Sequence, residues 1–200
     1  MTAMVAEARD ELSEIWHRKV LLGGIKPLDV LGSLDDYYKF CAAKDWLQDT
    51  AEVLLAHRAK GFSSDAMAAY LELWGVLQAV YVQQDAIDIL YRVVCEKKFL
   101  FEECGPDWKD IRVLRDRAVG HPAYADRTDV KGSVSIGRAR KSYDRIVFQA
   151  YVKGGPSRTE TIALGAMIDK YDQVAAAQIK NITAALTARL DSVRQTSPSE

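Results

Sequence analysis

The sequence predicts a mainly α-helical domain with a small antiparallel β insertion before its last helix. Apolar residues recur at helical spacing over most of the chain, and the period changes to strand-like alternation only between residues 131 and 164. Hydrophobic residues make up 48% of the 200 residues and charged residues 28%, which is typical of a globular chain. We expect one domain over residues 1–194, with the insertion at 131–164 and a disordered tail at 195–200.

The first two predicted helices are delimited by residues that start and stop helices. The first covers about residues 2–22, where a Gly-Gly pair ends it. The second covers about residues 33–60, with Ser33 as its cap, Asp36 three residues later, and Gly61 at its end. These signals predict two well-bounded helices in the first third of the chain.

The third predicted helix is long and pairs with the second. It begins after Ser63 and Ser64 and continues to about residue 97. A short turn joins it to the second helix, which predicts an antiparallel pair with its Trp and Tyr residues in the core. A shorter fourth helix covers about residues 105–120, and a last, Ala-rich helix about 164–193. We expect two or three antiparallel strands between these last two helices.

The β insertion has a distinct charge. The whole chain has a net charge of -1, but residues 131–158 hold seven basic residues and one acid. A basic strand pair can follow the backbone of a polyanion, and we expect RNA to bind there. The insertion's aromatic side chains are expected to pack inward. The candidate RNA-binding residues are Arg138, Arg140, Lys141 and Arg145.

The fourth helix places an arginine on its buried face. Trp108, Ile111, Leu114 and Ala118 recur at intervals of three and four and define the apolar stripe. Arg115 falls inside that stripe, and a buried guanidinium requires a partner or an aqueous pocket. One interpretation is a structural salt bridge to an acid of the second or third helix, and the other is a functional site.

A histidine follows at the end of the same helix. His121 lies between Gly120 and Pro122, so it is pushed out of the helical conformation and can turn back toward Arg115. The alternative is a solvent-exposed histidine at the end of the helix. Arg115 and His121 together favour a shared site more than either residue does alone.

The segment from Arg115 to His121 resembles the central motif of the HEPN superfamily, the higher eukaryote and prokaryote nucleotide-binding domains. That motif is an Arg, commonly followed by Asn or Asp, and a His after four to six residues. Asp116 and the gap of five residues fit it, and so does the order of the predicted helices. Some members have a Tyr two residues after the His, whereas here that place holds Ala123 and Tyr124 comes one residue later.

The resemblance implies an up-and-down helical bundle that acts as a metal-independent endoribonuclease. It implies a homodimer in which two motifs meet in one cleft, and Arg115, His121 and Asp116 as the catalytic residues. A neutral His can take the proton of an RNA 2′-hydroxyl while Arg stabilises the phosphorane, which leaves a 2′,3′-cyclic phosphate. The role expected is that of a toxin or defence effector, with an antitoxin or nucleotidyltransferase as a potential partner.

A polar segment in the third helix is a second-tier candidate. Gln84, Asp85 and Asp88 interrupt an apolar stretch, and groups in such surroundings should be hydrogen-bonded. Asp85 or Asp88 could orient Arg115 or His121. A structural polar network between helices explains the same residues equally well.

Other chemistries find little support in the sequence. The three cysteines lack disulfide or zinc-site spacing, and the three histidines lie on separate predicted elements, with His17 and His57 expected to be exposed. We expect no metal, no cofactor, no membrane span and an intracellular, cytoplasmic protein. Two alternatives to the ribonuclease remain: a non-catalytic bundle of the same fold that binds a protein or nucleotide, and a plain helical interaction module.

Overall fold

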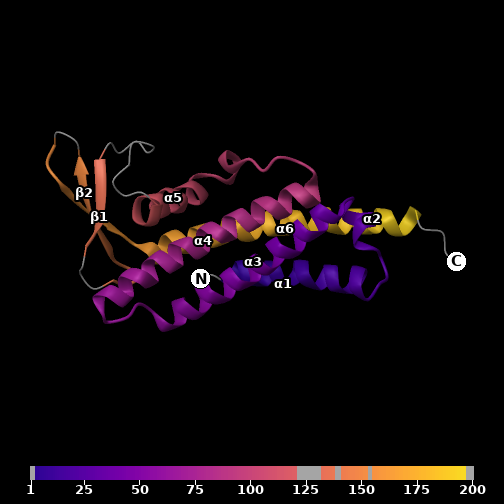
Figure 1. Cartoon of the computed structure of the whole chain (residues 1–200), viewed down its shortest axis with the longest axis horizontal. Coiled ribbons are helices and arrows are strands. Elements are labelled where there is room, and N and C mark those ends of the chain that lie inside the picture. The colour runs from indigo at the N-terminus through magenta and orange to yellow at the C-terminus, as the bar shows by residue number, and fades with distance from the viewer. Residues whose placement is uncertain (1–2, 121–131, 138–140, 153–154, 197–200) are drawn as a thin grey trace. The chain divides into compact units, whose positions relative to one another are not determined.

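A computed structural model describes residues 3–120, 132–137, 141–152 and 155–196 of the chain. The described chain is mainly α-helical, with six α-helices and a three-stranded antiparallel sheet before the last of them (Figure 1). The helices are α1 (Ala3–Trp16), α2 (Pro27–Leu31), α3 (Leu34–Lys60), α4 (Ala66–Cys95), α5 (Pro106–Arg115) and α6 (Leu164–Thr196). This confirms the expected fold class at the level of helices with a β insertion.

The chain divides into two compact units that share the three long helices. The first unit contains mainly residues 53–81 and 101–171, and the second contains residues 2–52, 82–100 and 172–200. Each unit therefore holds one part of α3, one part of α4 and one part of α6. Because these helices continue from one unit into the other, neither unit is a contiguous stretch of sequence.

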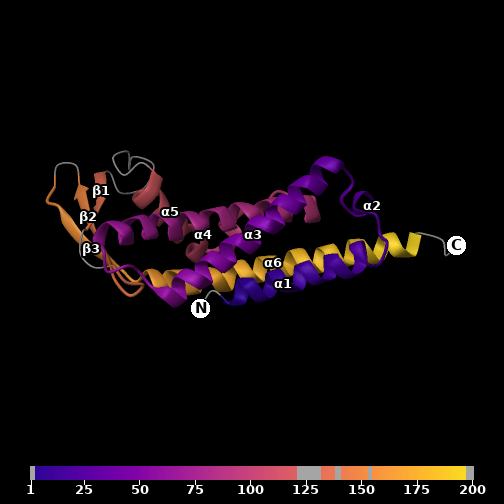
Figure 2. The same ribbon diagram turned by 60° about the horizontal axis from the view of Figure 1, so that its bottom comes forward.

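The sheet belongs to the first unit and has the order β1-β2-β3 (Figure 2). Its strands are β1 (Gly132–Ile136), β2 (Ile146–Val152) and β3 (Arg158–Ile162). Both neighbouring pairs are antiparallel, and in the register of β2 with β3 Phe148 lies opposite Glu160. Phe148 is fully buried, as expected of the insertion's aromatic residues, whereas Tyr151 is exposed. Successive side chains of a strand point to opposite faces of the sheet. Phe148 and Tyr151 are three residues apart on β2, so Tyr151 lies on the face opposite to Phe148, which is exposed to solvent at this position.

Helix starts follow local capping chemistry. The backbone N–H of Asp36 donates to Oγ of Ser33 at 3.1 Å, which confirms Ser33 as the cap of α3. The third helix was predicted to start after Ser63 and Ser64, and α4 begins at Ala66. Asp65 caps α4, because its Oδ1 accepts the backbone N–H groups of Met67 and Ala68.

Several short elements lie beyond what the sequence predicted. One turn of π-helix follows α1 (His17–Leu21) and another follows α5 (Asp116–Gly120), while a short 3-10 helix covers Phe101–Cys104. The helix α6 continues to Thr196, so the expectation of disorder was wrong for residues 195 and 196, which are helical. Residues 197–200 lie outside the described part of the chain.

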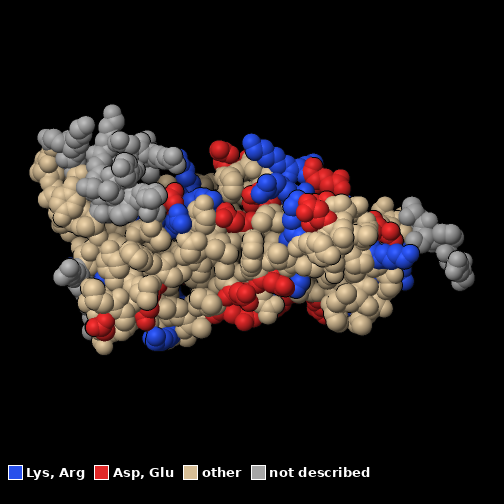
Figure 3. Space-filling view, in the orientation of Figure 1, with Lys and Arg blue, Asp and Glu red and all other residues tan. Residues whose placement is uncertain are grey.

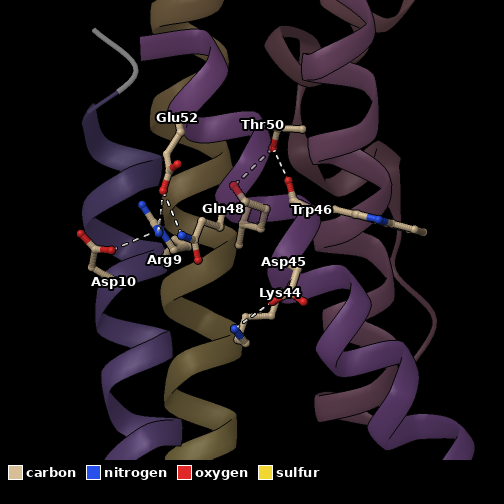
Figure 4. A network of polar contacts seen from close by, with 9 residues as sticks. Arg9, Asp10, Lys44, Asp45, Trp46, Gln48, Thr50 and Glu52 are labelled. Atoms are coloured by element: carbon tan, nitrogen blue, oxygen red, sulfur yellow. Dashed lines mark hydrogen bonds and ion pairs between the residues drawn. The ribbon is translucent and has the colours of Figure 1, made fainter. Parts of the chain in front are cut away.

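The second unit is a helical bundle with few charged groups in its interior. Arg9 of α1 lies close to Asp10 and to Glu52 of α3, at 3.2 Å and 3.8 Å (Figure 4). The buried carboxylate of Asp172 in α6 accepts the backbone N–H groups of Met4 and Val5. It thus satisfies two of the amides that the start of α1 leaves without helical partners.

Large apolar side chains are not all in the core. Trp46 is 45% exposed and Trp74 39% exposed, so the expectation that the Trp residues of these helices are buried was wrong. Trp74 shares one face of α4 with exposed Met67 and Leu71, at spacings of four and three residues. Elsewhere charged side chains of both signs are interspersed on the face drawn in Figure 3, in keeping with the small net charge.

Candidate functional site

The candidate site lies at the end of α5 in the first unit. Gly105 has a φ of 80°, which glycine adopts easily, and Pro106 then starts the helix. Trp108, Ile111 and Leu114 are buried, as the predicted stripe requires. Arg115 is the last residue of α5, and its side chain is only partly exposed.

The guanidinium of Arg115 is held by an amide and a neighbouring carboxylate. Its Nε and Nη2 donate to Oε1 of Gln78 at 3.2 Å and 3.0 Å. Its Nη1 donates to Oδ1 of Asp116 at 2.9 Å, and its side chain is 22% exposed. The partner from the third helix is therefore an amide of α4 and not the acid that the sequence suggested. The amide of Gln78 orients the guanidinium without neutralising its charge, whereas the carboxylate of Asp116 compensates part of that charge.

Asp116 occupies the first position of the π-helical turn that follows α5. Its side chain is 54% exposed and its carboxylate pairs with Arg115. Such single π-turns occur frequently at functional sites. The pairing agrees with a supporting role for Asp116, because a carboxylate beside Arg115 restricts the rotamers of the guanidinium.

Tyr81 lies under two arginines of α5, a feature that the sequence analysis missed. The guanidinium carbon of Arg115 lies 4.3 Å from the centre of the Tyr81 ring, and that of Arg112 lies 4.0 Å from the same centre. Arg112 also lies 5.2 Å from the centre of the Phe101 ring. The spacing of three residues between Gln78 and Tyr81, and again between Arg112 and Arg115, was the signal available in the sequence.

His121 lies outside the described residues, as do Arg138 and Arg140. The pairing of Arg115 with His121 therefore stays a prediction of the sequence. The π-turn that leads to residue 120 is anchored on the sheet, because Arg117 Nη2 donates to Oε2 of Glu160 at 2.6 Å. The Arg117 side chain is only 13% exposed, so this ion pair fixes the end of the turn against β3.

The second-tier residues belong to the second unit. Gln84 is fully buried, while Asp85 and Asp88 are half-buried. Oδ2 of Asp88 accepts a bond from Nη2 of Arg92 at 2.5 Å, one turn further along α4. That contact is structural, and a role of Asp85 or Asp88 in orienting Arg115 or His121 stays a prediction.

The two described basic candidates of the insertion differ in exposure. Arg145 is exposed and forms a backbone bridge with Ser142. Lys141 is only 3% exposed, and its Nζ donates to the carbonyl of Gly137 at 3.1 Å and lies 5.1 Å from the centre of the Tyr70 ring. Burial lowers the pKa of Lys141. Lys141 therefore bonds the backbone next to the sheet. Its ammonium is buried, so it does not offer the exposed charge that the predicted RNA contact requires.

A second polar cluster surrounds His57, which the sequence analysis expected to be exposed. Its side chain is 13% exposed, because Phe62 and Tyr143 pack on the ring. Nδ1 of His57 lies 2.7 Å from the hydroxyl of Tyr143, and Nε2 lies 3.8 Å from Oε2 of Glu72. Burial lowers the pKa of His57 and raises the pKa of Tyr143 to about 12. Both groups are thus uncharged at neutral pH, and the cluster ties α3 to the loop before β2.

Alternative chemistries find no assembled site in the described part of the chain. Among the described residues no three His, Cys, Asp or Glu side chains come together as a metal site would require. Burial raises the pKa of the Cys104 thiol to about 11, which leaves little thiolate for nucleophilic attack. Over the same residues, every helix is too short or too polar to cross a bilayer.

Comparisons with known proteins found no relative of this chain. It matches no protein-family model, no curated protein and no solved structure.

Proposed function

We propose that this chain is a metal-independent endoribonuclease of the HEPN type that acts on cytoplasmic RNA as a toxin or defence effector. The observation that carries the proposal is the anchoring of Arg115. Its guanidinium bonds the neutral amide of Gln78, stacks on Tyr81 and is 22% exposed. A cation that is held in one orientation and remains partly exposed can stabilise the negative charge of a phosphorane.

The proposed reaction follows from the chemistry of two side chains. His121 takes the proton from the 2′-hydroxyl of RNA, and the resulting oxygen attacks the adjacent phosphorus. Arg115 binds the phosphate oxygens, and Asp116 holds Arg115 through the bond to Nη1. A His121 from a second copy of the chain would protonate the 5′-oxygen of the leaving strand. The products are a 2′,3′-cyclic phosphate and a 5′-hydroxyl, and DNA lacks the attacking hydroxyl.

Cleavage of single-stranded RNA in EDTA tests the proposal. Wild type should cleave a mixed-sequence RNA panel, and both His121→Ala and Arg115→Gln should lose at least about a hundredfold in rate, as expected on removing a general base. Lys109→Gln is the matched control, since Lys109 is an exposed cation of the same helix. Equal rates in wild type and His121→Ala, or a requirement for a divalent ion, would exclude this mechanism.

The same contacts also favour a second candidate, a non-catalytic bundle in which Arg115 is structural. All three nitrogens of its guanidinium are engaged, with Gln78 and Asp116. Thermal unfolding separates the two functions. A buried structural pair costs about 3–5 kcal/mol when broken by Arg115→Ala, whereas an arginine in an open site should cost far less.

A further inference from the structure

Glu160 of β3 lies on the face of the sheet that is buried. In the register of β2 with β3 it is opposite Phe148, and side chains directly opposite each other in an antiparallel pair lie on the same face. Phe148 is fully buried, and the side chain of Glu160 is 37% exposed. A carboxylate on the face that a sheet buries requires a partner that compensates its charge.

Arg117 is that partner, and it comes from the π-turn that follows α5. Its Nη2 donates to Oε2 of Glu160 at 2.6 Å, and its guanidinium carbon lies 6.0 Å from the centre of the Phe148 ring. The Arg117 side chain is 13% exposed, and Ala118 is buried beside it in the same turn. The turn (Asp116–Gly120) also lies next to β1. The turn and the sheet belong to the first unit, so the ion pair joins two parts of one compact body.

The conformation of this turn is one that its own sequence does not impose. A π-helix is a rare form of helix with i→i+5 bonds, and it occurs mostly as single turns within α-helices. The segment Asp116–Gly120 contains no proline, so its sequence would allow α5 to continue as an α-helix. An uncommon backbone conformation persists where its surroundings hold it, and the contacts with the sheet supply that hold. A shift by one residue rotates a side chain by about 100° about the helix axis, so a loss of the turn would move the residues that it carries.

We propose that Arg117 and Glu160 are positioning residues of the site, because their ion pair holds the π-turn and thereby fixes Asp116 against Arg115. Asp116 is the first residue of the turn, and its Oδ1 accepts from Nη1 of Arg115 at 2.9 Å. The inference rests on the proposed ribonuclease function and gives the β insertion a part in catalysis that is separate from RNA binding. Arg117 and Glu160 act through the turn and make no contact with the substrate.

Hydrogen exchange tests the hold on the turn without any RNA. Glu160→Gln removes the charge and retains the size of the side chain. The backbone amides of residues 117–120 should then exchange at least about tenfold faster than in wild type, because the turn opens more often, while those of residues 108–115 keep their rates. Thr159→Val is the matched control, since it removes the exposed bond from Thr159 to Gln149 on the same strand and should change no rate in the turn. Unchanged exchange of residues 117–120 in Glu160→Gln would overturn the inference.

The separation of kcat from KM tests the effect on the reaction. At a temperature where every variant is folded, Glu160→Gln and Arg117→Gln should lower kcat for single-stranded RNA about tenfold or more, because a small displacement of a reacting group slows the chemical step. KM should change less than about twofold, since neither residue binds the substrate. Arg117→Lys keeps a cation opposite Glu160 and should restore kcat to within about threefold of wild type. Should Arg117→Gln fail to fold, Glu160→Gln and Arg117→Lys still decide the role.

The outcomes distinguish this inference from the proposed function. If wild type cleaves RNA and Glu160→Gln cleaves it with the same kcat, the positioning role is wrong and the ribonuclease proposal stands. If wild type cleaves no RNA, the proposed function fails together with the catalytic part of this inference. Faster exchange of residues 117–120 in Glu160→Gln would in that case still support the ion pair as the group that holds the turn.

Discussion

Arg115 shows how a residue's surroundings decide between a structural and a chemical role. The sequence placed it correctly on the buried face of its helix, but the nature of its partner followed only from the structure. One acceptor is Gln78, a neutral side chain 37 positions away, and the other is the adjacent Asp116. Periodicity reports which face a residue is on, and it carries no information about which distant side chain meets that face.

Gln78 is expected to matter for activity through Arg115. Gln78→Leu removes the oxygen that accepts from Nε and Nη2 of Arg115, so the guanidinium loses its fixed orientation. Hydrogen bonds to charged groups contribute about 1.5–3 kcal/mol, so the RNA cleavage rate should fall about tenfold or more. Gln48→Leu is the control, since Gln48 bonds only Glu52 at the surface among the described residues. An unchanged rate in Gln78→Leu would show that Arg115 is oriented without this bond.

At the scale of elements, the sequence predicted which helices and strands exist better than it predicted where each of them begins and ends. Every long helix and all three strands lie where the periods placed them, because period depends on many residues at once. Helix ends depend on one or two side chains. The sequence predicted that the third helix starts after Ser63 and Ser64, but the side chain that caps it, Asp65, followed only from the structure. The π-turns after α1 and α5 carry no compositional signal that distinguishes them from ordinary helix.

Capping of α4 can be tested with neighbouring substitutions. Asp65→Ala removes the acceptor for the N–H groups of Met67 and Ala68, and should lower the free energy of unfolding by about 1 kcal/mol. Ser64 is exposed, and Ser64→Ala should change stability by less than about 0.5 kcal/mol. Chemical denaturation measures both. A larger loss in Ser64→Ala than in Asp65→Ala would contradict the observed helix start.

The cluster around His57 should make the first unit sensitive to acid. Burial lowers the pKa of His57 below its usual 6.5, so the unfolded chain binds this proton at a higher pH than the folded chain. The contribution is fully present above 6.5 and is lost as the pH falls through the lowered pKa. Glu72 opposes the shift and Lys60 reinforces it, but burial has the largest effect.

Thermal unfolding at neutral and mildly acidic pH measures this effect. Between about pH 7 and pH 5, the melting temperature should fall more in wild type than in His57→Gln, which has no titrating imidazole. His17→Gln is the control, because His17 is exposed and should retain the wild-type dependence. The same pH dependence in wild type and His57→Gln would contradict the assignment.

At the scale of the whole molecule, the proposed reaction needs a second copy of the chain. Met67, Leu71 and Trp74 are exposed on one face of α4, and the same spacing leads on to Gln78. The sequence analysis expected aromatic residues of this helix in the core, because periodicity identifies an apolar face without saying what covers it. We expect this face to contact the partner subunit.

A single charge on that face should separate the subunits. Leu71→Asp should convert a dimer to a monomer in sedimentation and abolish RNA cleavage, because the second His121 is lost with the partner. Leu28→Asp adds the same charge at another exposed leucine and should leave both properties unchanged. A wild-type protein that sediments as a monomer yet cleaves RNA would contradict the composite site.

The end groups of the cleaved RNA test the central claim most directly. In EDTA, wild type should produce 2′,3′-cyclic phosphate and 5′-hydroxyl ends, and His121→Ala should produce neither. An RNA with a 2′-deoxy sugar at the cleaved position should remain intact. Ends with a 5′-phosphate, or cyclic ends formed equally by His121→Ala, would contradict the account.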